Sequence, residues 1–331
     1  MTQARTALVG LAEIQTAASR VAALAHRTPA LRFTGSAAPV FLKCENMQRT
    51  GAFKLRGAAN MLQLLPDGSR RNGVITYSSG NHGQAVALAA QSLGVPAVVV
   101  MPTTAPAVKV AGARAFGAEV IFEGTTSAER RVCAEQEAVR RCLTIVPPFD
   151  HEWIIAGQGT VGLEILEQVP DVGLVLVPIG GGGLIAGVAA AIKLSRPGVR
   201  VVGVEPEGAN AMQQSLASGE PVTLARTASI ADGLLPTRPG ALTFAHVRAF
   251  VDEIVTVSDE AIVATMRRLY DEAKIVVEPS GATGLAALLA GSVAVPSGPQ
   301  GPRPIVAVLS GGNVSPQHLS LLLDPVAAAS S

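Results

Sequence analysis

A lysine in a glycine-bounded turn is the first residue of this chain that could carry chemistry. Lys54 follows Phe53 in the segment Thr-Gly-Ala-Phe-Lys-Leu-Arg-Gly-Ala, which spans residues 50–58 and leads into a helical stretch. Such a lysine can simply be a solvated surface charge. When it is withdrawn from water, its pKa falls and the free amine can form a Schiff base with a carbonyl cofactor. The segment therefore indicates a candidate anchor for a cofactor.

Residues 77–84, Tyr-Ser-Ser-Gly-Asn-His-Gly-Gln, form a second candidate segment directly after an apolar run. A strand-to-helix junction of this kind offers unpaired backbone N–H groups and short side chains, which suit a carboxylate. The candidate ligands are Ser78, Ser79, Gly80 and His82. Ser79 or Asn81 can instead cap the helix. The imidazole of His82 can be a proton shuttle or a structural hydrogen-bonding group, and we favour the structural role.

Two further glycine-rich segments follow buried-type strands. In the third, Leu184 is preceded by Gly180, Gly181, Gly182 and Gly183, which let backbone amides turn toward a phosphate. The dinucleotide fingerprint and the Lys-Ser/Thr ending of a P-loop are both absent from this stretch, so a phosphate monoester is the expected ligand. In the fourth, Leu-Ser-Gly-Gly-Asn at 309–313, the hydroxyl of Ser310 can meet a ring nitrogen or belong to an ordinary turn.

In this order, the four segments resemble the serine/threonine dehydratase and serine racemase family of fold type II pyridoxal-phosphate (PLP) enzymes. The resemblance covers nearly the whole chain and includes weaker matches at residues 147–150, 155–160, 230–233 and 277–282. It implies the family's two-lobed fold and its cofactor, pyridoxal 5'-phosphate.

The resemblance also implies a role for each matching residue. Lys54 would carry the cofactor, Phe53 would lie beside its ring and Asn81 would bind the 3-hydroxyl group. Ser310 would face the pyridine nitrogen. The phosphate loop would consist of Gly180, Gly181, Gly182, Gly183 and Leu184, and the substrate carboxylate site of Ser78, Ser79, Gly80 and His82.

The activity that this resemblance implies is α,β-elimination from a β-hydroxy amino acid such as L-threonine or L-serine. Lys54 would remove the Cα proton, a hydroxyl would leave from Cβ, and the products would be a 2-oxo acid and ammonia. A neutral Ser310 at the ring nitrogen makes the cofactor a weaker electron sink than a carboxylate would, which favours elimination over transamination. Phe149 and Asp150 match the dehydratase form of the segment that flanks the ring.

Other activities stay open. Ser79 stands where serine racemases place a second acid/base opposite the lysine, so it is a candidate catalytic residue for racemisation. Ala52 replaces a serine that is common before the Phe-Lys pair, so the substrate can also be phenylserine or 3-hydroxyaspartate. A sulfhydrylase-type β-replacement enzyme and a non-catalytic ligand-binding protein are the remaining alternatives.

A divalent-cation site, for Mg²⁺ or Ca²⁺, is only partly matched. Glu205 and the carbonyl of Ala209 stand at the family's ligand positions, but Ala211 takes the place of a carboxylate. A hard cation would lose a charged oxygen there. The sequence therefore does not support a complete metal site.

The elements that must position these segments follow a β-α-β rhythm. Short apolar runs at 73–77, 97–101, 119–122, 174–178, 201–205 and 304–309 alternate with helix-period stretches such as 83–93, 107–116, 157–168 and 259–273. That alternation predicts an α/β fold with parallel-rich twisted sheets flanked by helices. We expect a discontinuous large domain of residues 1–68 and 145–331, a small domain of residues 69–144, and the cofactor in the cleft between them. Residues 292–304 are expected to form a surface loop.

Composition narrows the class of ligand. The 331 residues are 48% hydrophobic and carry a net charge of +1, which favours a small molecule over nucleic acid or an anionic membrane. All apolar runs are shorter than the roughly 20 residues that span a bilayer. The three cysteines lack metal-ligand spacing and cannot all pair, which fits a reducing cytoplasm. The family resemblance implies a homodimer.

Overall fold

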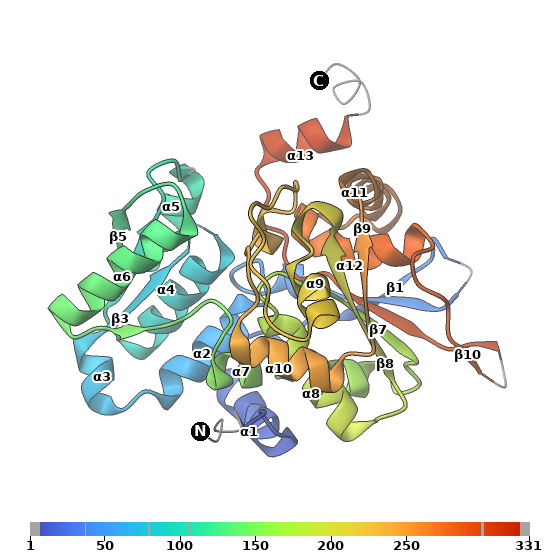
Figure 1. The fold of residues 1–331 in the computed structure, drawn as a ribbon, viewed down its shortest axis with the longest axis horizontal. Helices are drawn as coiled ribbons and strands as arrows, with labels where there is room; N and C mark the ends of the chain where they lie inside the picture. Colours follow the sequence, from blue (N-terminus) through green and yellow to red (C-terminus); the bar gives the residue numbers. More distant parts are fainter. Residues whose placement is uncertain (1–6, 37, 79, 106, 299–300, 325–331) are drawn as a thin grey trace.

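The structure is a computed structural model in which residues 7–36, 38–78, 80–105, 107–298 and 301–324 are described. It contains a six-stranded and a four-stranded sheet, each with helices on both faces (Figure 1). This arrangement confirms the expected α/β fold. With 3-10 helices written η, the elements are α1 (Leu11–Val21), β1 (Ala30–Phe33), β2 (Val40–Lys43), η1 (Glu45–Met47), α2 (Lys54–Leu64), α3 (Asp67–Asn72), β3 (Val74–Tyr77), α4 (Asn81–Leu93), β4 (Ala97–Met101), α5 (Ala107–Ala115), β5 (Glu119–Phe122), α6 (Ser127–Arg141), β6 (Thr144–Ile145), α7 (Glu152–Gln168), β7 (Leu174–Pro178), α8 (Gly183–Ser195), β8 (Arg200–Pro206), η2 (Glu207–Ala209), α9 (Ala211–Ser218), η3 (Asp232–Leu234), α10 (Ala241–Phe250), β9 (Glu253–Val257), α11 (Asp259–Ala273), α12 (Pro279–Leu289), β10 (Ser297–Gly298), β11 (Gly301–Pro302), β12 (Ile305–Val308) and α13 (Pro316–Leu323).

Both ends of the chain contribute to the larger sheet, whose strand order is β1-β2-β12-β7-β8-β9. The early strand β2 pairs in parallel with the late strand β12, with Val40 opposite Ile305. Only the edge pair β1–β2 is antiparallel among the described pairs of this sheet. Helices α11 and α12 cover one face and α7, α8 and α10 cover the other. Because both faces are covered, the central strands are apolar throughout rather than alternating.

The smaller sheet has the order β5-β4-β3-β6, with all neighbours parallel. Helices α2, α4 and α5 pack on one face and α6 packs on the other. Helix α2 contacts both α4 and α7, so it lies between the two sheets and their domains. The helix that begins at Lys54 is therefore held from both sides.

A buried ionic network fixes the first turns of α2. Arg56 is fully buried and donates two hydrogen bonds to the Glu45 carboxylate, from Nε and from Nη2, each at 2.8 Å. Its Nη1 donates to Glu164 of α7 at 2.6 Å, and Lys43 of β2 donates to the same carboxylate. Burial alone would raise the pKa of Glu45, but the charge and hydrogen bonds of Arg56 lower it below its usual value. The carboxylate is thus stabilised in its charged form inside the protein.

One detail differs from the sequence-based expectations. Residues 292–304 do not form only a loop, because β10 and β11 pair within them as a short antiparallel hairpin. The expected limits of the small domain fall inside α3 and β6, so the division into domains stays a proposal based on the two sheets. In the part of the chain that is described, no helix is long and apolar enough to cross a membrane.

The Arg56→Met variant is expected to lose about 3–5 kcal/mol in the free energy of unfolding, because it leaves the Glu45 carboxylate buried without its partner. Urea denaturation at pH 7 measures this loss. The exposed pair Arg131–Glu135 provides the control, since Arg131→Met is expected to cost less than about 1 kcal/mol. Equal losses in the two variants would contradict a stabilising role for the buried network.

Candidate functional site

The first and fourth glycine-rich segments are joined backbone to backbone. Ala52 and Gly311 form an isolated antiparallel bridge, and the Phe53 N–H donates to the Ser310 carbonyl at 3.1 Å. This pairing places the start of α2 beside the end of β12. Lys54 and Ser310, which are far apart in the sequence, therefore belong to one site.

Lys54 is half-buried at the first position of α2. Its Nζ donates to the Pro148 carbonyl at 2.7 Å and lies 5.1 Å from the centroid of the Phe53 ring. Burial lowers the pKa of Lys54 to about 8, although the nearby Glu278 carboxylate acts to raise it. A much larger fraction of this amine is neutral at physiological pH than in an exposed lysine, which suits a nucleophile.

Asn81 connects α4 of the small sheet to the large domain. Its Nδ2 donates to Glu278 Oε1 at 2.7 Å, and its Oδ1 accepts from Asn313 Nδ2 at 2.9 Å. Helix α4 begins at Asn81, but this side chain does not cap it. The structure therefore does not show Asn81 as the helix cap, which is one of its two interpretations.

The four consecutive glycines connect β7 to the first turn of α8. A Cβ atom at Gly181 would lie 2.3 Å from the Phe149 ring, and one at Gly183 would lie 2.9 Å from Phe149 Cβ. Gly182 has a φ of +93°, which favours glycine. The Thr243 hydroxyl donates to the Gly181 carbonyl at 2.7 Å, which fixes that peptide. The loop is therefore a bare backbone turn at a helix N-terminus, where an anion can bind.

Ser310 is buried, and only 4% of its surface is exposed. Its hydroxyl donates to the Ser280 carbonyl at 3.3 Å, which is long for an O–H donor. Ser280 belongs to α12, and its own hydroxyl accepts from the Gly233 N–H at 3.0 Å. A weakly held hydroxyl at the end of β12 is free to bind a ring nitrogen.

The second segment lies at the N-terminus of α4, where Ser78 and Gly80 are half-buried. Ser79 lies outside the described residues. His82 is buried, with Nε2 placed 3.1 Å from the Val146 carbonyl, and burial together with the charge of Lys54 lowers its pKa to about 3. The ring is therefore neutral at physiological pH.

The candidate metal residue Glu205 is hydrogen-bonded to the backbone in this structure. Its carboxylate accepts from the backbone N–H groups of Met212 and Gln213 at 2.9 and 2.8 Å, at the start of α9. Burial raises the pKa of Glu205 to about 7. Ala209 is buried nearby, but no group of three or more His, Cys, Asp or Glu side chains suited to a metal occurs among the described residues. The Glu205 carboxylate is thus a helix cap.

Sequence reasoning missed the partners that hold the site together. Glu278 and Asn313 both bind Asn81, and the only signal was that they lie in matched stretches at 277–282 and 309–313. Asp150, in the segment that matches the one flanking the ring, accepts from the backbone N–H groups of Leu242 and Thr243 and caps α10. Contacts of this kind depend on packing between elements that are distant in the sequence.

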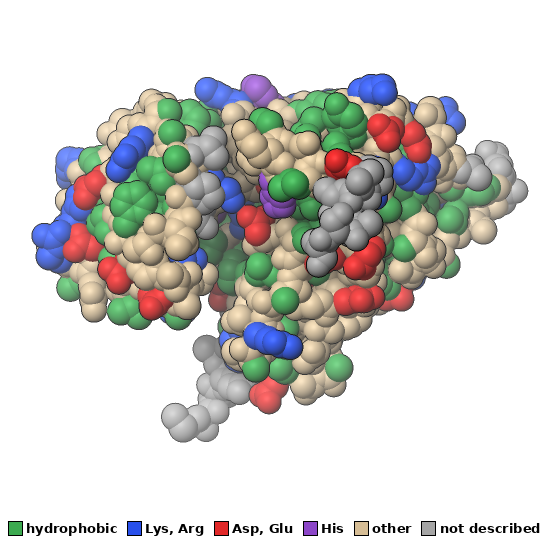
Figure 2. All heavy atoms as spheres, turned by 90° about the horizontal axis from the view of Figure 1, so that it is seen from above, with side chains coloured by type: hydrophobic (Ala, Val, Ile, Leu, Met, Phe, Trp, Pro, Cys, Tyr) green, Lys and Arg blue, Asp and Glu red, His purple; other side chains and the backbone are tan. Residues whose placement is uncertain are grey.

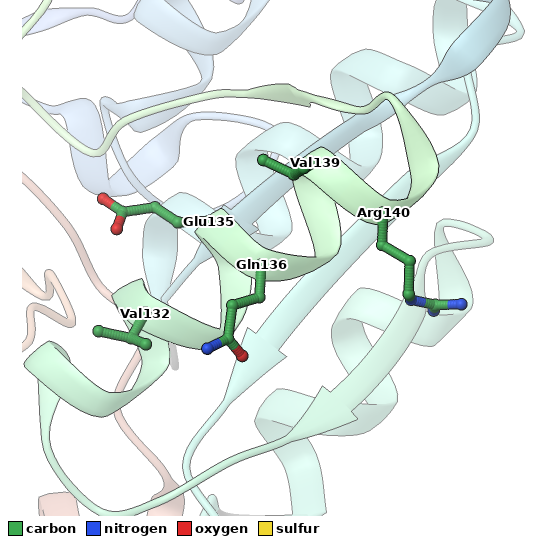
Figure 3. Close-up of a pocket in the computed structure, with 5 residues that line it drawn as sticks. All are labelled: Val132, Glu135, Gln136, Val139 and Arg140. Atoms are coloured by element: carbon green, nitrogen blue, oxygen red, sulfur yellow. The ribbon is translucent and has the colours of Figure 1, made fainter.

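The parts of the chain built around the two sheets also meet through an ion pair. Lys109 of α5 donates to Asp232 of η3 at 3.1 Å. Figure 2 shows a notch in the outline between the smaller and larger lobes, with positive and negative side chains interspersed on this face. A separate shallow hollow on α6, lined by Val132, Glu135, Gln136, Val139 and Arg140, includes none of the site residues (Figure 3).

Known proteins resemble this chain over most of its length. Residues 21–311 match the family described as pyridoxal-phosphate dependent enzyme. The L-threonine ammonia-lyase of Geobacter sulfurreducens is 45% identical over 286 residues, which are 86% of this chain and 70% of that protein. The serine racemase of Oryza sativa subsp. indica is 44% identical over 305 residues, 91% of this chain and 90% of that protein. The structure of maize serine racemase has a TM-score of 0.91 at 41% identity and covers 95% of this chain and 96% of its own.

The Gly181→Ala variant is expected to weaken binding of pyridoxal phosphate by about 10-fold or more, because the added Cβ would collide with the Phe149 ring and shift the loop. Titration of the cofactor-free protein, followed by absorbance, measures the dissociation constant. Gly68→Ala is the control, since a Cβ there meets nothing within 4 Å. An unchanged dissociation constant in Gly181→Ala would argue against this loop as the phosphate site.

Proposed function

Because the chain belongs to the family of pyridoxal-phosphate dependent enzymes, we propose that it is an ammonia-lyase of the serine/threonine dehydratase type. It would convert a β-hydroxy amino acid such as L-threonine or L-serine into a 2-oxo acid and ammonia. The observation that carries the proposal is Lys54, whose pKa is about 8 and which is joined through the backbone to neutral Ser310. The identity to an L-threonine ammonia-lyase supports the same assignment.

The residues of the site fit pyridoxal phosphate. The backbone turn at the start of α8 suits the phosphate, Lys54 Nζ suits the aldehyde carbon and the Ser310 hydroxyl suits the pyridine nitrogen. Asn81 has one N–H left for the 3-oxygen, because its other N–H binds Glu278. When bound, the cofactor supplies an electron sink for the charge left on the substrate Cα.

Lys54 would both hold the cofactor and move the substrate proton. With a pKa of about 8, its Nζ can release and accept a proton near neutral pH, as a general base and acid must. The Pro148 carbonyl accepts from this Nζ and so orients it. The first-turn N–H groups of α4, where the described residues provide no side-chain cap, would bind the substrate carboxylate together with Ser78 and Gly80.

Amino acid racemisation is the second candidate function. Racemisation needs a proton donor on the face of Cα opposite Lys54, and Ser79 is the residue proposed for that role. The similarity to two serine racemases supports this alternative. Elimination stays the main proposal, because Phe149 and Asp150 match the dehydratase form of their segment.

Incubation of the holoenzyme with L-serine, L-threonine, threo-3-hydroxyaspartate and phenylserine tests the function. We expect 2-oxo acid and ammonia in equal amounts, in excess over any D-isomer, and no product from the Lys54→Ala variant. Chiral chromatography and an oxo-acid assay measure both outcomes. Formation mainly of D-amino acid would replace the lyase assignment by a racemase, and the Ser79→Ala variant would then lose that activity selectively.

The rate at which cofactor-free enzyme takes up pyridoxal phosphate should rise with pH through a midpoint near 8 and level off roughly two pH units higher, because half of Lys54 is neutral at its pKa of about 8. The readout is the growth of absorbance at about 410 to 430 nm. Nα-acetyl-lysine is the control, and its rate should keep rising toward its ordinary pKa of about 10.4. A midpoint near 10 in the protein would contradict a desolvated Lys54.

We further propose that the enzyme acts in the cytoplasm as a homodimer with a small amino acid as substrate. The free cysteines Cys44, Cys133 and Cys142 are compatible with a reducing compartment. The dimer follows from the family resemblance. Light scattering that gave the single-chain mass of 33.7 kDa at working concentration would contradict it.

A further inference from the structure

Glu278 is a buried carboxyl group that touches the candidate site and has no part in the chemistry proposed above. It precedes α12, and only 6% of its surface is exposed. Its Oε1 accepts from Asn81 Nδ2 at 2.7 Å, and a Cβ at Gly311 would lie 2.2 Å from the same oxygen. The carboxyl group therefore lies against the backbone turn that follows Ser310.

The Asn81 amide is held by partners that can bind it in one orientation only. An ionised Glu278 can only accept, so it requires the Asn81 amino group on its side. Asn313 Nδ2 donates to Asn81 Oδ1 at 2.9 Å and also to the Thr50 carbonyl at 2.7 Å, which fixes the Asn313 amide in turn. If the Asn81 amide rotated by half a turn, its oxygen would face the Glu278 carboxylate, which is an acceptor. Its amino group would then face Asn313 Nδ2, which is a donor, so neither hydrogen bond could form.

We propose that Glu278 is a positioning residue that keeps an N–H group of Asn81 directed toward the 3-oxygen of pyridoxal phosphate. The inference rests on the proposed cofactor role of Asn81. Because Asn81 lies on α4 and Glu278 on the large domain, the same hydrogen bond also ties the small domain to the cofactor site. Glu278 thus acts through Asn81 rather than on the substrate.

Charged groups from several elements face Glu278. Burial and the charge of Asp232 in η3 raise its pKa, whereas the Asn81 side chain, Lys109 of α5 and the Asn313 backbone lower it, and the resulting value is about 7. Lys54 of α2 interacts with the same carboxylate. Above this pH Glu278 is an acceptor only and fixes Asn81, and below it the protonated group can also donate and no longer enforces one orientation.

The orientation of Asn81 is visible in the spectrum of the bound cofactor. An N–H donor stabilises the ionised 3-oxygen, which absorbs at about 410 to 430 nm, whereas an amide oxygen facing it stabilises the protonated form, which absorbs near about 330 nm. In the holoenzyme, the shorter-wavelength fraction should therefore grow as the pH falls through about 7.

Two variants with side chains similar in size to glutamate distinguish the effect of losing the hydrogen-bond acceptor from the effect of changing the side-chain volume. Glu278→Gln can donate as well as accept and cannot ionise, so we expect a spectrum that does not change between pH 6 and 8 and that resembles the native spectrum below about pH 7. Glu278→Met removes the acceptor, so we expect about 10-fold weaker binding and a shift of the band toward about 330 nm. Asn81→Ala should abolish the effect of Glu278→Met in a double-mutant cycle.

Thr283→Val is the matched control on the same helix, because the buried Thr283 hydroxyl bonds only within α12, to the Pro279 carbonyl at 3.0 Å. It should leave both the dissociation constant and the spectrum unchanged.

A native protein that fails to bind pyridoxal phosphate would refute the proposed function itself. Normal binding by the native protein with an unaltered band in Glu278→Met would overturn only the role of Glu278. If Glu278→Met does not fold, the Glu278→Gln variant provides the test. A cofactor absorption band that still changes with pH in Glu278→Gln would then overturn the proposed role of Glu278.

Discussion

The buried ion pair between Arg56 and Glu45 is the interaction on which the position of Lys54, the proposed catalytic lysine, depends. Removing a guanidinium and a carboxylate from water is costly, and the pair is stable here because Glu164, the Thr160 hydroxyl and the His26 carbonyl complete the hydrogen bonds of Arg56. Arg56 and Lys54 are two residues apart in α2, so their side chains leave the helix roughly 200° apart. Arg56 is therefore anchored on one side of the helix while Lys54 is presented on the other.

Closure of the proposed site would depend on contacts between the two proposed domains rather than within them. Asn81 of α4 binds Glu278 and Asn313 of the large domain, and Lys109 of α5 binds Asp232 of η3. Domains joined by few polar contacts can move relative to each other. A cofactor that binds the glycine loop on one domain and Asn81 on the other would favour the arrangement in which these contacts are made.

Sequence reasoning selected segments whose backbone geometry is determined locally. Lys54, the four glycines and Ser310 each lie next to a strand or helix end, and turn residues at such ends are determined by nearby backbone geometry. Glu278 escaped notice because its importance comes from Asn81, which is 197 residues away in the sequence. The role of Arg56 could not be inferred from the sequence, since only the fold reveals that Glu45 and Glu164 enclose it. The hairpin at β10 and β11 was missed for the opposite reason, because a segment rich in Gly and Pro can pair briefly as well as form a loop.

The electrostatics of the site show how the Lys54 amine can lose its proton near neutral pH without a separate base to remove it. Burial lowers the pKa of Lys54 to about 8, and burial raises that of Glu278 to about 7, so the two groups change charge within a narrow range around neutrality. An ionised Glu278 favours the protonated lysine, whereas a neutral Glu278 favours the free amine. The amine can therefore lose its proton near physiological pH at little cost. In a fully exposed lysine, deprotonation at physiological pH would cost more free energy, because water stabilises the charged form. The reactive state of Lys54 is thus a property of its surroundings rather than of its sequence neighbours alone.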